Sequence, residues 1–338
     1  EPGADCVDWA PMMDFFNHHR RPYASQVRTV EFSTPHPGIS SACSWLRIET
    51  QKAPAAISKV TLRFDPGLQR ISGTTTNVER LSLDRSALLL IDSVVLAIDD
   101  SLTTTIRFTS YQERLWLEKV SGRWAEIQPP PASDKNPGRC GPFKDVFRNY
   151  VTLVYGTKGS AEENRWAFEQ ARYDAERFWY QGNGSMAVLS DREYWSSGER
   201  VDFHPYEDGN VVLYGNAETN SMWKVLLGAS PVQVRRGAVS IGEKTVKGSG
   251  LFCLFIRPHP TREKACVAAV SGTGIEGMRA AMPLGYLSPG LPFPDLLVGS
   301  SDIFTRGEDA IVAAGYFGTN WSVETGDIAW NPALLKSR

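Results

Sequence analysis

The stretch "ACVAAVSGTGIEG", residues 265–277, decides the fold class of the second half of the chain. Its apolar run predicts a buried strand, its glycines predict a tight turn, and the residues from Gly277 onward predict a helix. Gly272-x-Gly274-x-x-Gly277 in that order is also the pattern of a dinucleotide-binding fingerprint. Asp302, after the next apolar run, stands where an acid for the ribose would be expected.

Two observations weigh against a nucleotide enzyme. No second mononucleotide half is recognisable, and no His or Tyr acid partner follows the glycines. Tight strand-to-helix turns also need glycine whether or not a phosphate is bound. We therefore expect architectural glycines. A nucleotide- or small-molecule-binding domain that uses the turn Gly272–Gly277 stays as an alternative.

The same strand, glycine and helix order recurs along the chain. The run 151–155 ends at Gly156 and the run 211–214 ends at Gly215, while 296–298 ends at Gly299. Helices are predicted after the first two, one opened by the capping box Ser160 to Glu163 and one over 218–227. Continuous apolar strands that alternate with helices favour a mostly parallel, doubly wound α/β domain over residues 143–338.

The helix that starts at Ser160 has a predicted inner and outer face. Spacing places its inner stripe at Phe168, Ala171, Ala175 and Phe178. The outer face is expected to carry ion pairs. Asp174 and Glu176 are two positions apart, so their side chains point apart on a helix and do not form an acid–base pair. We assign both residues to the salt-bridged outer face. The expected outer-face partners are Arg165, Glu169, Arg172 and Glu176.

Loops of such a domain gather at the carboxyl edge of the sheet, so any ligand pocket is expected there. Turn glycines and capping amides explain the same residues without a ligand. The candidate pocket residues are Gly156, Thr157, Asn183, Gly215, Asn216, Gly272, Thr273 and Gly274.

The first part of the chain has a different pattern. Residues 8–20 predict a short helix, with Asp8 as cap and Pro11 in its first turn. Short β-type runs fill residues 25–127 without a convincing helix, which predicts a β-sandwich. Five prolines in "QPPPASDKNPGRCGP", residues 128–142, predict a linker between the two domains.

Two sets of aromatic or apolar residues in this part raise questions of burial. The apolar stripe of the helix predicted over residues 8–20 must be buried against the β-rich domain, against a hydrolase domain or against a second copy of this chain. A carbohydrate-binding sandwich is a further alternative if its aromatic residues are exposed, although a core role is the simpler expectation. The stripe comprises Trp9, Met12, Met13 and Phe16, and the sugar platform would comprise Trp45, Tyr111, Trp116 and Trp124.

Composition narrows the function class. The chain has 338 residues, 42% of them hydrophobic, and a net charge of −2, which suits about two globular domains. No apolar run is long enough for a membrane span, and no basic run is suited to binding nucleic acid. We therefore expect neither a membrane nor a nucleic acid as a partner. The five cysteines and five histidines lack metal-ligand spacing, and we expect no metal and no cofactor. We favour a secreted or periplasmic location over a cytoplasmic one.

A nucleophile elbow is missing, because no G-x-S-x-G occurs and Gly38–Ala42 lacks a preceding strand and a following helix. No catalytic residue is therefore assigned on this chain.

Several motifs carry a family resemblance. "CGPFKDVF", "VYGTKGSAEENRWAFEQARYDAERFWYQGNGS", "VVLYGNAETN" and "SPVQVRRGAVSIG" resemble the C-terminal part of large prolyl-oligopeptidase-like serine hydrolases. "DWAPMMDFFNHHRRP" resembles the last helix of their α/β-hydrolase domain. The resemblance is most specific over residues 140–240. It implies an esterase or peptidase with a Ser-His-Asp triad upstream of this chain, an upstream hydrolase domain as partner, and a polysaccharide or peptide as substrate.

Overall fold

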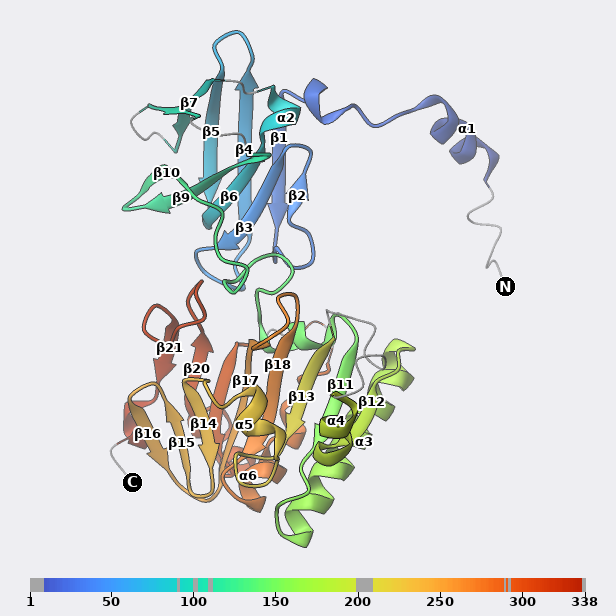
Figure 1. The fold of residues 1–338 in the computed structure, drawn as a ribbon, viewed down its shortest axis with the longest axis vertical. Coiled ribbons are helices and arrows are strands. Elements are labelled where there is room, and N and C mark those ends of the chain that lie inside the picture. The colour runs from blue at the N-terminus through green and yellow to red at the C-terminus, as the bar shows by residue number, and fades with distance from the viewer. Residues whose placement is uncertain are drawn as a thin grey trace. The chain divides into compact units, whose positions relative to one another are not determined.

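The computed structural model describes residues 9–89, 92–99, 103–108, 112–198, 209–288, 290 and 293–335. The chain divides into two compact units, Glu1–Pro129 and Pro130–Arg338, which are coloured from blue to green and from green to red in Figure 1. We call them the β-rich unit and the α/β unit. Together they confirm the coarse expectation of an α/β part plus a β part. Among the described residues, no helix is both long and apolar enough to span a bilayer.

The β-rich unit holds two five-stranded sheets. Its first sheet has the order β1-β4-β5-β7-β8 and its second has the order β10-β9-β6-β3-β2. All pairs are antiparallel except β5 with β7. The strands are β1 (Thr29–Thr34), β2 (Ala42–Cys43), β3 (Leu46–Gln51), β4 (Ser58–Asp65), β5 (Arg70–Thr76), β6 (Val78–Asp84), β7 (Ser93–Ile98), β8 (Thr104–Arg107), β9 (Arg114–Val120) and β10 (Arg123–Ile127).

One hydrophobic core is shared by the two sheets. In β4, Val60, Leu62 and Phe64 are buried while the alternate residues Lys59, Thr61 and Arg63 are exposed. This period of two is the reason that the segment forms a strand with one face on the core. Side chains of the second sheet, among them Leu81 and Leu117, join the same cluster.

The short helices of this unit differ from the expectation. Helix α1 (Ala10–His18) has Pro11 in its first turn as predicted, and the predicted cap Asp8 lies outside the described residues. A turn η1 (Ala24–Gln26) follows. Within residues 25–127, where no convincing helix was expected, the chain forms helix α2 (Arg85–Leu88), because the Asp84 carboxylate accepts the Ala87 N–H and caps it.

The predicted linker 128–142 belongs largely to the α/β unit and is tied down there. The Lys135 ammonium lies 2.6 Å from an Asp295 carboxylate oxygen, and both side chains are buried. The guanidinium of Arg139 donates to the carbonyls of Arg262 and Ala265. Residues after the boundary are thus held by a buried ion pair and by hydrogen bonds to the rest of the α/β unit.

The α/β unit is built on an eight-stranded sheet of order β12-β11-β13-β18-β17-β19-β20-β21. Neighbours from β12 to β18 run parallel, and every pair from β18 to β21 is antiparallel. The expectation of a mostly parallel sheet is therefore wrong for half of it. An apolar run predicts a buried strand but carries no information on its direction, and β17 returns from the preceding hairpins without a crossover helix.

The strands of this unit are β11 (Val151–Tyr155), β12 (Ala187–Ser190), β13 (Asn210–Tyr214), β14 (Val232–Arg235), β15 (Ala238–Ile241), β16 (Lys244–Lys247), β17 (Leu251–Pro258), β18 (Cys266–Gly272), β19 (Leu296–Ser300), β20 (Ile311–Tyr316) and β21 (Asp327–Trp330). Its helices and 3₁₀ turns are η2 (Phe143–Phe147), α3 (Ala161–Gly182), α4 (Asp191–Gly198), α5 (Met222–Leu226), α6 (Ile275–Ala280), η4 (Met282–Leu284), α7 (Ile303–Arg306), η5 (Gly307–Ala310) and α8 (Pro332–Leu335). Figure 1 shows α5 and the small β14-β15-β16 sheet lying over one face of the large sheet.

Helix α3 begins as predicted, and its predicted inner stripe is correct in part. The capping box is present, with the Ser160 hydroxyl accepting the Glu163 N–H and the Glu163 carboxylate accepting the Ser160 N–H. Ala171 is buried and Ala175 packs against the core as expected, whereas Phe168, also expected inside, is 39% exposed and packs edge-on against Tyr155. The buried residues of the helix are Glu163, Trp166, Ala167, Gln170, Ala171 and Asp174.

Candidate functional site

The carboxyl ends of β11 and β13 form the place where an α/β sheet offers a ligand crevice. The chain passes from β11 outward to β12 and then returns to β13 on the other side of β11. This reversal is a topological switch point, where the loops diverge and open a cleft. The predicted residues Gly156 and Thr157 follow β11, and Gly215 and Asn216 follow β13.

Two buried asparagine side chains fill this switch point. The Asn216 amide nitrogen donates to the Gly272 carbonyl at 2.9 Å and so joins the ends of β13 and β18. The Asn220 amide nitrogen donates to the carbonyls of Val154 (3.0 Å) and Tyr214 (3.1 Å), and so joins β11 to β13. Both side chains are fully buried. These amides satisfy strand-end carbonyls that a ligand or water would otherwise contact.

Gly156 and Gly215 are required by the same loop. A Cβ at Gly156 would lie 2.4 Å from the Thr219 carbonyl oxygen, and one at Gly215 would lie 2.6 Å from the Thr219 hydroxyl. Gly215 also has φ of +118°, a backbone conformation that favours glycine. The predicted helix over 218–227 starts only at Met222, because residues 216–220 form this hydrogen-bonded turn.

The fingerprint glycines contact the chain's own backbone. A Cβ at Gly272 would lie 2.3 Å from the Met278 nitrogen, one at Gly274 would lie 2.7 Å from the Ser249 carbonyl oxygen, and one at Gly277 would lie 2.0 Å from that of Leu251. In a dinucleotide site, the second glycine allows the pyrophosphate to approach. Here Ser249 occupies that approach.

Thr273 completes this packing. Its backbone carbonyl accepts the Gly237 N–H at 2.9 Å, and its hydroxyl accepts the Leu251 N–H at 3.0 Å. The turn between β14 and β15 therefore covers the end of β18. Asp302 lies beyond β19, and the antiparallel strand β17 separates β19 from β18. These positions give no support to the nucleotide alternative.

Asp191 is a member of this edge that sequence reasoning missed. Its carboxylate accepts the Thr157 hydroxyl at 2.6 Å and the Ser221 N–H and hydroxyl, each at 2.7 Å. Although burial opposes them, these hydrogen bonds hold the pKa of Asp191 below its ordinary value. An ionised carboxylate thus links the loop after β11 to the start of α5.

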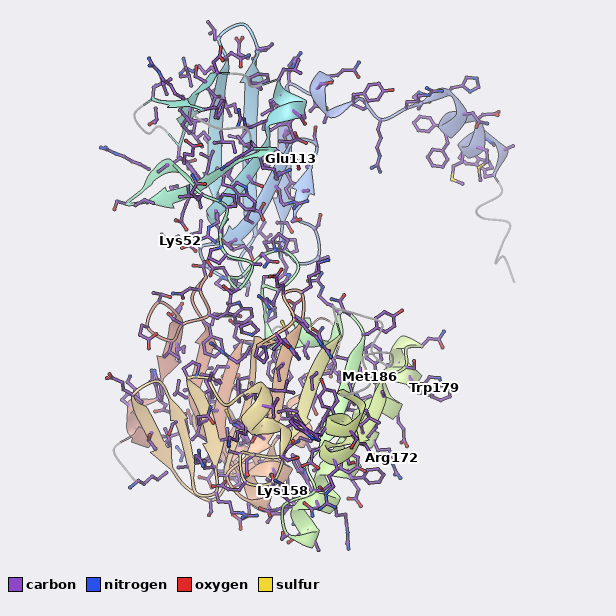
Figure 2. All side chains as sticks on the ribbon, in the orientation of Figure 1. Lys52, Glu113, Lys158, Arg172, Trp179 and Met186 are labelled. Atoms are coloured by element: carbon purple, nitrogen blue, oxygen red, sulfur yellow. The ribbon has the colours of Figure 1, made fainter. Side chains whose placement is uncertain are left out.

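Seven of the eight predicted pocket residues are therefore brought to one edge, and Asn183 is not. Asn183 is the left-handed C-cap of α3, a helix of 22 residues that spans about 33 Å. Figure 2 shows Lys158, in the loop before α3, near one end of this helix and Trp179 near the other. Asn183 therefore caps the C-terminus of α3, at the far end of this helix from the edge cluster.

The buried face of α3 carries an acidic residue. Asp174, expected on the outer face, instead accepts the hydroxyls of Tyr214 (2.8 Å) and Tyr286 and the Gln170 amide (3.0 Å). Burial raises the pKa of Asp174 to about 6, against the lowering effect of these hydrogen bonds. Glu176 does lie outside, 3.3 Å from Arg172. The group is sealed from solvent, so it offers a proton-linked contact within the fold.

The histidines are not gathered into a site. His259 is buried, its Nδ1 accepts the Thr261 N–H at 3.3 Å, and burial with nearby Arg262 and Arg139 lowers its pKa to about 4. His18, the last residue of α1, and His19, its C-cap, are exposed, and His204 lies outside the described residues. Within the ranges that the structure describes, no three His, Cys, Asp or Glu side chains form a group suited to a metal ion.

Two of the four aromatic residues considered for a sugar platform have the core role that was the simpler expectation. Trp45 and Trp124 are core residues, with their indole N–H groups donating to the Val27 carbonyl and to Asp99. Trp116 is half-buried, and Tyr111 lies outside the described residues. Buried indoles with satisfied N–H groups contribute to the core and offer no sugar-stacking face.

No protein-family model matches the chain, and no curated protein matches it.

Proposed function

We propose that this chain is the non-catalytic C-terminal accessory region of a prolyl-oligopeptidase-like serine hydrolase. The hydrolase would be of esterase or peptidase type, with its Ser-His-Asp triad in a domain upstream of these residues. The family-like motifs over residues 140–240 support this reading. In finer detail, we assign the β-rich unit to the β-sandwiches and the parallel half of the α/β unit to the doubly wound class.

The observation that carries the proposal is the unburied apolar face of α1. Trp9 and Phe16 are each 62% exposed, Met13 and Phe15 are exposed as well, and no residue of the helix is buried. The β-rich unit therefore does not cover the stripe, contrary to the first of the expected arrangements. Apolar area costs about 25 cal/mol per Å² when it is left in water, so such a helix favours a further partner. A preceding hydrolase domain, to which the sequence of α1 is similar, is the partner that we assign.

The filled carboxyl edge is consistent with an accessory role. In open α/β sheets the catalytic groups converge at this edge. Here Asn216, Asn220 and Thr273 direct their side chains to strand ends of the chain itself. The two units would then act by positioning a polysaccharide or peptide substrate, or a partner, for the upstream triad.

A fluorophosphonate probe tests the non-catalytic reading, because it labels activated serines covalently. The 338-residue chain is expected to stay unlabelled, while a serine hydrolase in the same tube is labelled in full. Stoichiometric labelling of one serine of this chain, abolished by heat unfolding, would overturn the assignment.

A further inference from the structure

Helix α3 ends at an asparagine that is followed by a glycine. Asn183 is the C-cap of this helix, and it is the one asparagine of the sequence whose next residue is a glycine, Gly184. The residue is exposed and has φ of 50°, a left-handed conformation that asparagine tolerates better than most residues do. Figure 2 labels Trp179 and Met186, which flank it along the chain.

Two groups that can react with each other are unengaged at this position. Among the described residues, the side-chain amide of Asn183 has no protein hydrogen-bond partner, and neither has the backbone nitrogen of Gly184. Glycine carries no Cβ, so its nitrogen is open to the side chain that precedes it. The carbonyl carbon of that side chain and this nitrogen can close a five-membered ring. Because both groups belong to one chain, the step is effectively unimolecular.

The folded conformation holds these two groups apart. With ψ of 28° at Asn183, the Gly184 nitrogen lies nearly opposite the side chain across the Cα–C bond, since Cβ and the backbone nitrogen are a third of a turn apart around that bond. The Asn183 N–H donates to the Trp179 carbonyl at 2.9 Å and maintains this conformation. Gly184 lies against Phe178, because a Cβ there would be 2.3 Å from a ring carbon. Ring closure therefore requires the last turn of α3 to open.

We propose that Asn183 is a site of spontaneous deamidation, gated by opening of the C-terminal turn of α3. The Gly184 nitrogen bonds to Cγ of Asn183 and gives up its proton, the bond from Cγ to Nδ2 breaks, and ammonia leaves with that proton. One water molecule then opens the succinimide ring, at one carbonyl to an aspartate and at the other to an isoaspartate. Water is the only co-reactant, and no electrons are transferred. This modification does not depend on the accessory role proposed above.

Either product would weaken the end of the helix. An aspartate places a negative charge beside the C-terminal carbonyls, where the helix dipole is negative as well. An isoaspartate adds one carbon to the backbone before Gly184 and so displaces this residue from the Phe178 ring. The chain after α3 leads to β12, an edge strand of the large sheet. Deamidation would therefore loosen the connection between α3 and β12.

Peptide mapping by mass spectrometry tests the site after incubation of the full chain at mildly alkaline pH, which favours loss of the Gly184 proton. The peptide with Asn183 is expected to yield both acidic products, and about 10 to 100 times faster in urea than in the folded chain, because urea opens the turn. Asn149 is an internal control, since it is exposed as well but is followed by Tyr150, and its peptide is expected to stay unchanged.

Two results of this mapping would overturn the proposal. One is the absence of detectable conversion at Asn183 in the folded chain, even long after the urea sample has converted completely. The other is an equal rate in the folded and the unfolded chain, which would contradict the gate.

Substitutions separate the chemistry from its gate. Asn183→Gln lengthens the side chain by one carbon and is expected to stop the conversion, because a six-membered ring closes far more slowly. Phe178→Ala removes the ring that packs against Gly184 and is expected to raise the folded-state rate at least about threefold, with the rate in urea unchanged. Trp179→Ala is the matched control, since its side chain is 63% exposed and its carbonyl is retained. Conversion that persists in Asn183→Gln, or equal folded-state rates in the two alanine variants, would contradict the assignment.

Discussion

Two buried groups of the α/β unit are expected to give opposite dependences of stability on pH. The pKa of Asp174 is raised from 3.8 to about 6, so the folded state binds its proton more tightly than the unfolded state does. Its contribution to stability is present below pH 3.8 and is lost as the pH rises through about 6. The difference corresponds to about 3 kcal/mol.

His259 acts in the opposite sense. Its pKa is lowered from 6.5 to about 4, so its contribution is present above pH 6.5 and is lost as the pH falls through about 4. This difference also amounts to about 3 kcal/mol. The two contributions nearly cancel between pH 4 and 6.5. Together they therefore add little to the pH dependence of the free energy of unfolding of the native chain.

Single substitutions separate the two effects. Asp174→Asn is expected to make the free energy of unfolding rise by about 3 kcal/mol more than in the native chain between pH 4 and 6.5. His259→Asn keeps an acceptor for the Thr261 N–H. Over the same pH range, its free energy of unfolding is expected to fall by a similar amount relative to the native chain. Urea unfolding at closely spaced pH values, followed by circular dichroism, measures both. All other titrating groups are common to the three proteins, so the differences isolate each residue. Equal slopes in Asp174→Asn and the native chain would refute the assignment of the buried acid.

Four further substitutions, one of them a control, test the packing at the sheet edge and the exposure of α1 by thermal or urea unfolding. Gly277→Ala is expected to destabilise the α/β unit by about 1–3 kcal/mol, because its Cβ would clash with the Leu251 backbone. Gly182→Ala is the control and is expected to be tolerated, because its Cβ would lie 4.0 Å from the nearest atoms of the Phe178 ring. Equal destabilisation by the two substitutions would refute the contact at Gly277. Asn220→Ala is expected to cost about 2–4 kcal/mol, since it leaves two buried carbonyls without their donor, and a loss below about 0.5 kcal/mol would show that water replaces the amide. Trp9→Ala is expected to leave the melting temperature of this chain unchanged because the side chain is exposed, and a marked fall would reveal a contact within the chain.

Local features of the fold could be predicted from the sequence. The capping box at Ser160 and the glycine turns after β11, β13 and β18 depend on neighbouring residues, and they lie where the pattern places them. The direction of β17 could not be predicted in this way, since an all-buried strand has the same pattern in either direction. Asp174 was assigned to the wrong face because its partners, Tyr214 and Tyr286, are distant in sequence and only the fold brings them to α3.

The candidate sites show the same limit. Seven predicted residues lie at the sheet edge because strand ends meet there in any α/β sheet. The contribution of Asn220 to that edge could not be foreseen, because its carbonyl partners belong to two different strands.

Hydrogen exchange of α1 tests the central claim most directly. It is to be measured by mass spectrometry in the 338-residue chain and in a longer chain that carries the proposed hydrolase domain before this region. Our account predicts that residues 10–18 exchange rapidly in the shorter chain and become protected by at least about tenfold when the hydrolase domain is present. Equally fast exchange of α1 in both proteins would contradict the assignment of this region to such a hydrolase.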